Sequence, residues 1–248
     1  MQEHTAELYS PAIGTAGTVI RYGHYGRPVL VFPSEQGRAG DFAGNGMVGA
    51  VEGLIEAGRV KLYCVDSYDA ASWAARDQPL EERARRHGAY ESWILDQVAV
   101  WIHDDCGGPL PILTLGASMG AYHAANFALR RADLFPQALC LSGNYDPTTW
   151  HAWGQPGDAT YFNNPMAYVA NLDGGHLDWL RERLHILLVV GQGDFEVSPT
   201  GALPSTVRLA ELLTEKGIHH ELDLWGHDVA HDWPSWREQL RHHLPRFC

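Results

Sequence analysis

Cysteine is scarce in this chain of 248 residues, which contains only four: Cys64, Cys106, Cys140 and Cys248. Their spacing shows none of the close pairs that typically hold a metal ion. Cys64 and Cys140 lie within apolar runs, where cysteine serves as a small buried hydrophobe. We therefore expect reduced thiols, as in a cytoplasm, and no metal site built from cysteine.

Basic residues are also few, with 18 Lys and Arg against 30 Asp and Glu and a formal net charge of −12. Binding to nucleic acid or to an anionic membrane requires clustered Lys and Arg, so this balance argues against both partners and favours small molecules. The chain also lacks a run of about eighteen apolar residues. The segment 1–5 has no basic region followed by an apolar run, as a secretory signal would. We expect a soluble, cytoplasmic protein. The sequence does not indicate its oligomeric state.

No Pro/Ser linker, shift in composition, repeat or low-complexity segment divides the chain. Hydrophobic residues make up 45% of it, which is sufficient for a large core. Single α/β domains often reach this length, so the sequence predicts one domain spanning residues 1–248.

Short β-rich runs alternate with longer helical patterns, and most of the runs are continuously apolar. Such runs predict strands buried on both faces of a mostly parallel sheet, with helices on each side. The runs before Phe32 follow one another too closely for a crossover helix, so they predict an antiparallel edge at the N-terminal end. The predicted strands are Thr18–Tyr22, Pro28–Phe32, Val60–Val65, Ile112–Leu115, Ala138–Leu141, Ile186–Val190 and His220–Leu224, and the predicted helices are Met47–Ala57, Tyr90–His103, Met119–Arg131, Pro204–Lys216 and Trp233–Leu244.

The stretch from Asn144 to Arg183 breaks this alternation and is rich in aromatic residues. It is too long for a simple connection, and we expect a small cap or a pocket wall above the sheet. Trp150, Trp153 and Phe162 are candidates to line the substrate pocket there. The alternative is a surface excursion with its own small apolar cluster.

Gly116-Ala117-Ser118-Met119-Gly120 lies between an apolar run and an alanine-rich helical pattern. A serine on a tight turn from strand to helix needs small neighbours, because strand and helix approach closely there. This arrangement is a nucleophile elbow, and it leaves the Ser118 hydroxyl exposed at the carboxyl edge of the sheet. The sequence therefore predicts that Ser118 is a catalytic nucleophile.

A serine hydroxyl needs a base within hydrogen-bond reach, and that base needs an orienting carboxylate. With such an elbow, the acid and then the histidine follow the serine along the chain. Asp194 and Glu196 follow the strand predicted at Ile186–Val190, and His227 and His231 follow the last predicted strand.

The ending His231-Asp232-Trp233-Pro234-Ser235-Trp236 resembles the H-x-W-x-x-W ending of the esterase-D-like "putative esterase" family of α/β hydrolases. The elbow and the pair Ser142-Gly143 are similar to that family as well. Its members include feruloyl esterases, S-formylglutathione hydrolases and antigen-type mycolyltransferases. The resemblance covers about residue 29 to the C-terminus and implies an α/β-hydrolase fold, with His231 as the catalytic base and Ser118 as the nucleophile.

His227 matches no catalytic position of that pattern and stays an alternative base. His227 and His231 also imitate the H-E-x-x-H zinc motif, with Asp228 in place of Glu. A zinc site would need both histidines on one helical face, and the nearby Pro234 disfavours a continuous helix.

The acid has two candidates in the segment 191–196. Asp194 fits one register of a glycine turn, and Glu196 fits the same turn shifted by two residues. S-formylglutathione hydrolases carry the pattern Q-G-x-x-D, onto which Gln192, Gly193 and Glu196 fall. That resemblance favours Glu196, and the other carboxylate would be a solvated loop residue.

The oxyanion of the reaction would be held by backbone amides. The amide of Met119, directly after the nucleophile, is one predicted donor. The second is expected in the loop after the strand Pro28–Phe32. Proline has no N–H, which excludes Pro33 and leaves Ser34 or Glu35.

These residues together predict a serine hydrolase that cleaves a carboxylic ester through an acyl-enzyme intermediate, with no metal or organic cofactor. The alternative enzymatic activity is transfer of the acyl group to an alcohol in place of water. A binding protein on an inactive hydrolase scaffold is the alternative from another class.

Overall fold

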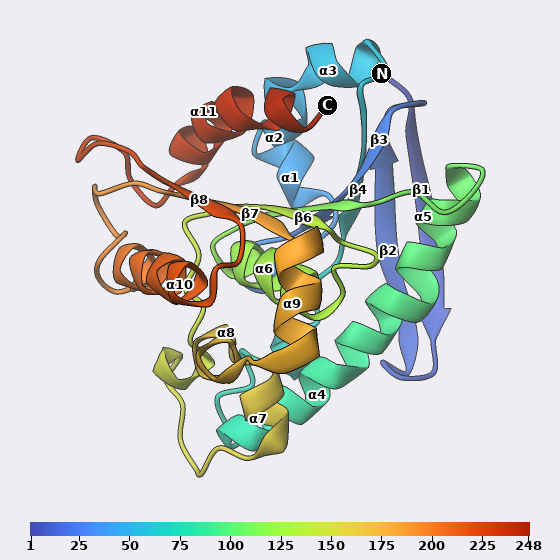
Figure 1. The fold of residues 1–248 in the computed structure, drawn as a ribbon. Helices are drawn as coiled ribbons and strands as arrows, with labels where there is room; N and C mark the ends of the chain where they lie inside the picture. Colours follow the sequence, from blue (N-terminus) through green and yellow to red (C-terminus); the bar gives the residue numbers. More distant parts are fainter.

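The computed structural model describes residues 1–248, and one eight-stranded sheet forms its centre (Figure 1). The strands lie in the order β1-β2-β4-β3-β5-β6-β7-β8. β3 to β8 are parallel to one another, whereas β2 pairs antiparallel with both β1 and β4. The strands are β1 (Glu3–Ser10), β2 (Thr15–Tyr22), β3 (Arg27–Phe32), β4 (Val60–Val65), β5 (Leu113–Ala117), β6 (Gln137–Leu141), β7 (His185–Val190) and β8 (His220–Leu224). The α/β class, the mostly parallel sheet and its antiparallel N-terminal edge are confirmed.

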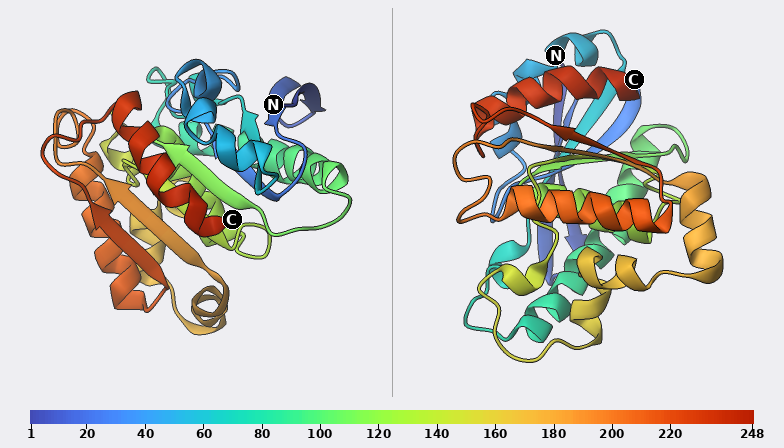
Figure 2. Two further views of the ribbon diagram at one scale, coloured as in Figure 1. Left: turned by 90° about the horizontal axis from the view of Figure 1, so that it is seen from above. Right: turned by 60° about the vertical axis from the view of Figure 1, so that its left-hand side comes forward.

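Helices cover both faces of the sheet (Figures 1 and 2). One face packs against α1 (Asp41–Gly44), α2 (Met47–Ala50), α3 (Glu52–Glu56) and α11 (Trp233–His243). The other face carries the larger apolar core, with α4 (Leu80–Trp93), α5 (Ala99–Asp105), α6 (Met119–Arg130), α9 (Gly174–Arg183) and α10 (Ala202–Lys216). The central strands β3, β4, β5 and β7 are buried on both faces, as their continuous apolar runs predict. No helix has the length and apolar composition needed to cross a bilayer.

Three elements of the structure differ from the sequence prediction. β1 was not predicted, because it is an edge strand with mostly exposed residues and no apolar run. The helix expected over Met47–Ala57 is interrupted at Val51, whose φ of −124° is not helical. The helix expected from Tyr90 begins earlier, at Leu80. Its first turns bury Arg83 and His87 at positions where apolar residues would have shown the helical period.

The stretch after β6 forms several short elements: η3 (Pro147–Thr149), α7 (Asp158–Phe162), α8 (Pro165–Tyr168) and η4 (Val169–Asn171), followed by α9. They lie on the α4 and α10 side of the sheet, at the bottom of Figure 1. α9 places Leu177 and Leu180 in the core and leads into β7. The stretch begins directly after β6, at the carboxyl end of that strand.

Candidate active site

Ser118 lies on the turn between β5 and α6, and its backbone has φ 58° and ψ −121°. Non-glycine residues rarely occupy this region, and such strain persists only where the surroundings enforce it. A Cβ atom at Gly116 would lie 2.2 Å from the carbonyl carbon of Gly120, and one at Gly120 would lie 2.4 Å from the carbonyl oxygen of Phe32. Both glycines are therefore needed for the close approach of strand and helix.

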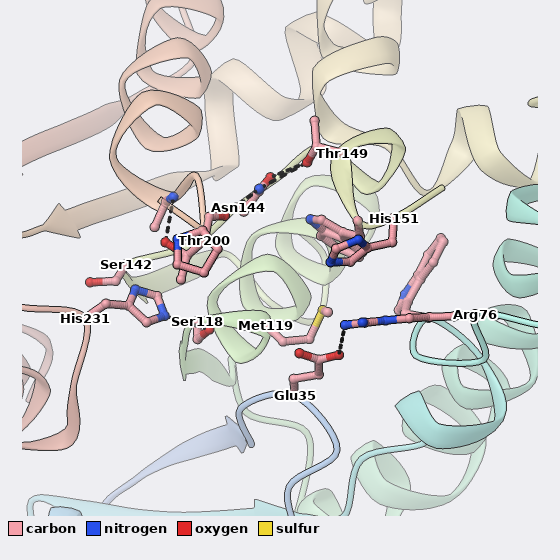
Figure 3. A pocket seen from close by; sticks show the side chains of 14 residues that line it. Glu35, Arg76, Ser118, Met119, Ser142, Asn144, Thr149, His151, Thr200 and His231 are labelled. Carbon is pink, nitrogen blue, oxygen red and sulfur yellow. Dashed lines mark hydrogen bonds and ion pairs between the residues drawn. The ribbon is translucent and has the colours of Figure 1, made fainter. Parts of the chain in front are cut away.

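His231 and Glu196 join Ser118 in one hydrogen-bonded chain (Figure 3 shows the serine and the histidine). The Nε2 atom of His231 lies 2.9 Å from the Oγ of Ser118, and its Nδ1 lies 3.1 Å from the Oε2 of Glu196. Glu196 follows β7 and is completely buried, and His231 follows β8. Residues from three loops thus meet at the carboxyl edge of the sheet.

Ser142, which follows β6, supports the carboxylate of Glu196 from its other side. The Oγ of Ser142 donates a hydrogen bond of 2.6 Å to Oε1, and the amide of Gly191 approaches the same oxygen at 3.4 Å. The family resemblance includes Ser142, but sequence reasoning assigned it no role. Its position after a buried strand beside the elbow strand was the available signal.

The loops that carry Glu196 and His231 are bonded to each other through their backbones. The amide of Gly193 donates to the carbonyl of Val229, and the amide of His231 donates to the carbonyl of Asp194, both at 2.9 Å. A Cβ atom at Gly191 would lie 2.1 Å from the carbonyl oxygen of Val229. This close approach of the two loops therefore requires glycine at position 191.

The alternative candidates, Asp194 and His227, take no part in the hydrogen bonds that connect Ser118, His231 and Glu196. The Asp194 side chain is exposed, and the residue contributes only its backbone carbonyl. His227 is also exposed, with its Nδ1 3.4 Å from the carbonyl of Gln192. Residues 226–232 form turns and no helix, so the two histidines do not share a helical face as a zinc motif requires. No group of three or more His, Cys, Asp or Glu residues is arranged to hold a metal ion.

The amides expected at the oxyanion position have no hydrogen-bond partner within the protein. This holds for the N–H groups of Met119, Ser34 and Glu35. The next amide in the loop after β3, that of Gln36, is engaged, because it donates to the Oδ2 of Asp69 at 3.1 Å. Asp69 is buried, and its other oxygen lies 3.2 Å from the Nε2 of buried His123. No sequence pattern singled out Asp69, since its contact with the loop is entirely tertiary.

A cavity of about 230 Å³ opens at Ser118 (Figure 3). Glu35 and Arg76 line this cavity, and the Nη2 of Arg76 lies 4.0 Å from the Oε1 of Glu35. Trp73, Trp150 and His151 form a wall of the cavity. Trp150 therefore lies where a residue of the expected substrate pocket would lie.

The expectation that Phe162 lines this pocket needs correction. Its side chain is 56% exposed and does not line the cavity. Trp153 does not line the cavity either, and its side chain is 51% exposed. Phe162 ends the short helix α7, whose buried residue Thr160 is bonded to Glu81 of α4. Two positions further along the helix, the phenyl ring faces away and contacts only Tyr161 edge to face among aromatic neighbours.

Arg83 of α4 holds the aromatic wall in place. Its buried guanidinium donates to the carbonyls of Trp73, Trp150 and His151 at 2.9, 3.2 and 3.1 Å. Burial, and secondarily the charge of Arg76, lowers the pKa of Arg83 from its usual value. One side chain therefore connects three residues that line the cavity.

A mostly parallel sheet with helices on both faces and a serine on a strained strand-to-helix turn defines the α/β-hydrolase class of protein. Within this class, the family model described as "Putative esterase" matches residues 51–247. The chain belongs to that esterase family and to the class of carboxylic ester hydrolases.

Solved structures with the same fold cover almost the whole chain at low sequence identity. A ferulic acid esterase has a TM-score of 0.73 at 18% identity, covering 99% of this chain and 97% of its own. MPT51 (FbpC1) of Mycobacterium tuberculosis has a TM-score of 0.76 at 14% identity, with the same coverages of 99% and 97%. An S-formylglutathione hydrolase (FrmB) of Staphylococcus aureus has a TM-score of 0.73 at 12% identity, covering 99% and 98%. No curated protein sequence matches this chain.

Proposed function

We propose that this protein hydrolyses a small-molecule carboxylic ester through an acyl-enzyme intermediate on Ser118. The observation that carries the proposal is the continuous chain from the Ser118 hydroxyl through the His231 ring to the buried carboxylate of Glu196. A base at 2.9 Å can take the hydroxyl proton as the serine attacks the ester carbonyl.

In this mechanism each residue has a distinct role. His231 accepts the Ser118 proton and then donates it to the leaving alcohol, while Glu196 orients the ring and stabilises its charged form. The unpartnered amides of Met119 and of Ser34 or Glu35 hold the negative oxygen of the tetrahedral intermediate. A water molecule, deprotonated by His231, then releases the acid and regenerates Ser118. If another alcohol takes the place of water, the same steps transfer the acyl group.

Labelling by a fluorophosphonate probe and turnover of 4-nitrophenyl acetate test the proposal. Ser118→Ala should abolish labelling and lower kcat by about 10⁴- to 10⁶-fold. Its folding should be intact, because alanine is no bulkier than serine at this position. Ser67→Ala is the matched control, since the Ser67 side chain makes no hydrogen bond and lies outside the cavity.

A Ser118→Ala protein that keeps more than about a tenth of the wild-type kcat would exclude the serine mechanism. Wild-type protein that is neither labelled nor active would indicate a binding protein on a hydrolase scaffold. Analysis of the products in the presence of added alcohols separates hydrolysis from acyl transfer.

A further inference from the structure

A second cavity of about 500 Å³ lies beside the one at Ser118, between α10, η3 and the loop 195–201. Four residues line both cavities: Asn144, Thr149, Pro199 and Thr200. The two cavities therefore share one wall, which we call the rim.

The rim is held by the amide of Asn144. Its Nδ2 donates to the Oγ1 of Thr149 at 3.1 Å and to the carbonyl of Thr200 at 2.9 Å, and Figure 3 shows this bridge beside His231 and Ser118. A ligand whose reacting group lies at Ser118 would have to cross this polar rim to reach the second cavity.

Several polar groups that line the second cavity form hydrogen bonds or ion pairs within the protein. The Oδ1 of Asp146 accepts hydrogen bonds from Thr148 and Asn164, and the Oγ of Ser205 accepts one from the amide of Tyr145. Arg208 pairs with Glu211 and Glu215 of its own helix. These contacts within the protein fix the positions of the polar side chains around the cavity.

Apolar side chains of the same cavity remain available for contact. Met166, Val197, Pro199, Pro204 and Leu212 belong to its lining. Val197 is 58% exposed, although valine side chains are usually buried. Covering this side chain with an apolar ligand group would remove apolar surface from water, which favours binding.

We propose that the second cavity binds the distal apolar arm of an elongated ester whose carbonyl lies at Ser118. This inference rests on the proposed esterase function and adds a substrate class to it, namely esters with an extended alkyl or arylalkyl arm. The wall shared with the catalytic cavity identifies the occupant as part of the substrate. The polar cavity at Ser118 holds the ester group, and the Asn144 rim separates the two parts.

The kinetic test is a series of 4-nitrophenyl esters from acetate to decanoate. Val197→Asn should lower kcat/KM for the decanoate by about five- to tenfold while leaving the acetate unchanged, because only the long chain reaches Val197. Pro204→Trp, which fills the cavity from the first turn of α10, should have the same selective effect. Leu224→Asn is the matched control, since Leu224 is 47% exposed on the edge strand β8 and lines neither cavity.

A second measurement is independent of turnover. Octanoate binding to the Ser118→Ala protein, measured by calorimetry, should weaken about five- to tenfold on adding Val197→Asn and stay unchanged on adding Leu224→Asn. Acetate should bind too weakly to detect.

The two proposals fail in different ways. An inactive wild-type protein that still binds octanoate through Val197 would contradict the hydrolase proposal alone. Unchanged decanoate-to-acetate ratios in Val197→Asn and Pro204→Trp, or octanoate binding that is insensitive to Val197→Asn, would overturn the second cavity as a substrate site.

Discussion

At the scale of single residues, the two oxygens of Glu196 have different partners. Oε1 accepts the hydroxyl of Ser142, and Oε2 lies 3.1 Å from His231. The side chain is completely buried, so water does not compete for either oxygen. Such a carboxylate has one available orientation, and this orientation positions the histidine ring toward Ser118.

Glu196→Gln should lower kcat by about 10³- to 10⁴-fold, because the amide cannot stabilise the charged ring and can favour the wrong tautomer of His231. Asp194→Asn is the matched comparison and should lower kcat less than about tenfold, since its side chain is exposed and unbonded. Turnover of 4-nitrophenyl acetate measures both, and the thermal unfolding of each variant shows that it is folded.

The opposite ranking would assign the acid role to Asp194. Mild effects from both substitutions would mean that the orienting carboxylate lies elsewhere in the chain.

At the scale of elements, the first turn of α4 connects the helix to the segment after β6. Arg83 donates to the carbonyls of Trp150 and His151. Glu81 accepts the amides of Gly157, Ala159 and Thr160 at the start of α7. Burial raises the pKa of Glu81, but these hydrogen bonds and that from the Thr160 hydroxyl outweigh it, so the pKa lies below its usual value. The segment after β6, which includes Trp150 and His151, is therefore held in place by a helix far earlier in the sequence.

Arg83→Met should destabilise the protein by about 2 to 4 kcal/mol, because three carbonyls lose their buried donor. Arg83→Lys, which keeps the charge and one donor, should lose less. In both variants the ratio of kcat/KM between bulky and small 4-nitrophenyl esters should change, since Trp73 and Trp150 are no longer held. Chemical denaturation and kinetics of the ester series measure the two effects.

Arg85→Met is the control on the same helix, because Arg85 is exposed and pairs only with Glu82. It should change the free energy of unfolding by less than about 0.5 kcal/mol. Selectivity that is the same in Arg83→Met and in wild type would contradict the role of Arg83 in positioning the wall.

At the scale of the whole molecule, several histidines are held in their neutral form by burial. Both ring nitrogens of buried His87 lack a partner, and the ring stacks 5.2 Å from His123. Burial lowers the pKa of His87 well below its usual range, and the nearby His123 and Arg130 lower it further. Burial also lowers the pKa of His185 and of His243.

These lowered pKa values predict a loss of stability in acid. Below pH ~6.5 the unfolded chain binds protons at these histidines that the folded protein does not, so the free energy of unfolding falls as the pH is lowered. Each such group contributes at most about 1.4 kcal/mol per pH unit. His87→Leu should reduce this slope, as measured by denaturation between pH 5 and 8.

Measurements at pH 8 serve as the control, because the histidines are neutral in both states there and a difference between the proteins reports packing alone. An equal slope in wild type and His87→Leu would show that His87 is not a source of the acid sensitivity.

Much of the fold could be predicted from local sequence because backbone constraints and two-sided burial act over a few neighbouring residues. Gly116 and Gly120 mark the elbow since no Cβ atom fits at either position. The continuous apolar runs mark β3 to β7 because both faces of these strands are covered. β1 was missed because an exposed edge strand needs no such run.

The sequence by itself determined the class of fold, the elbow serine and, through a family resemblance, the candidate base His231. Only the tertiary structure decided which side chains meet. Asp194 and Glu196 lie two residues apart in one loop, yet one is exposed and the other is buried beside His231. Trp150 faces the cavity, whereas Phe162 faces away from it. The physical reason is that the direction of a loop side chain depends on contacts with distant segments, which a local pattern does not contain.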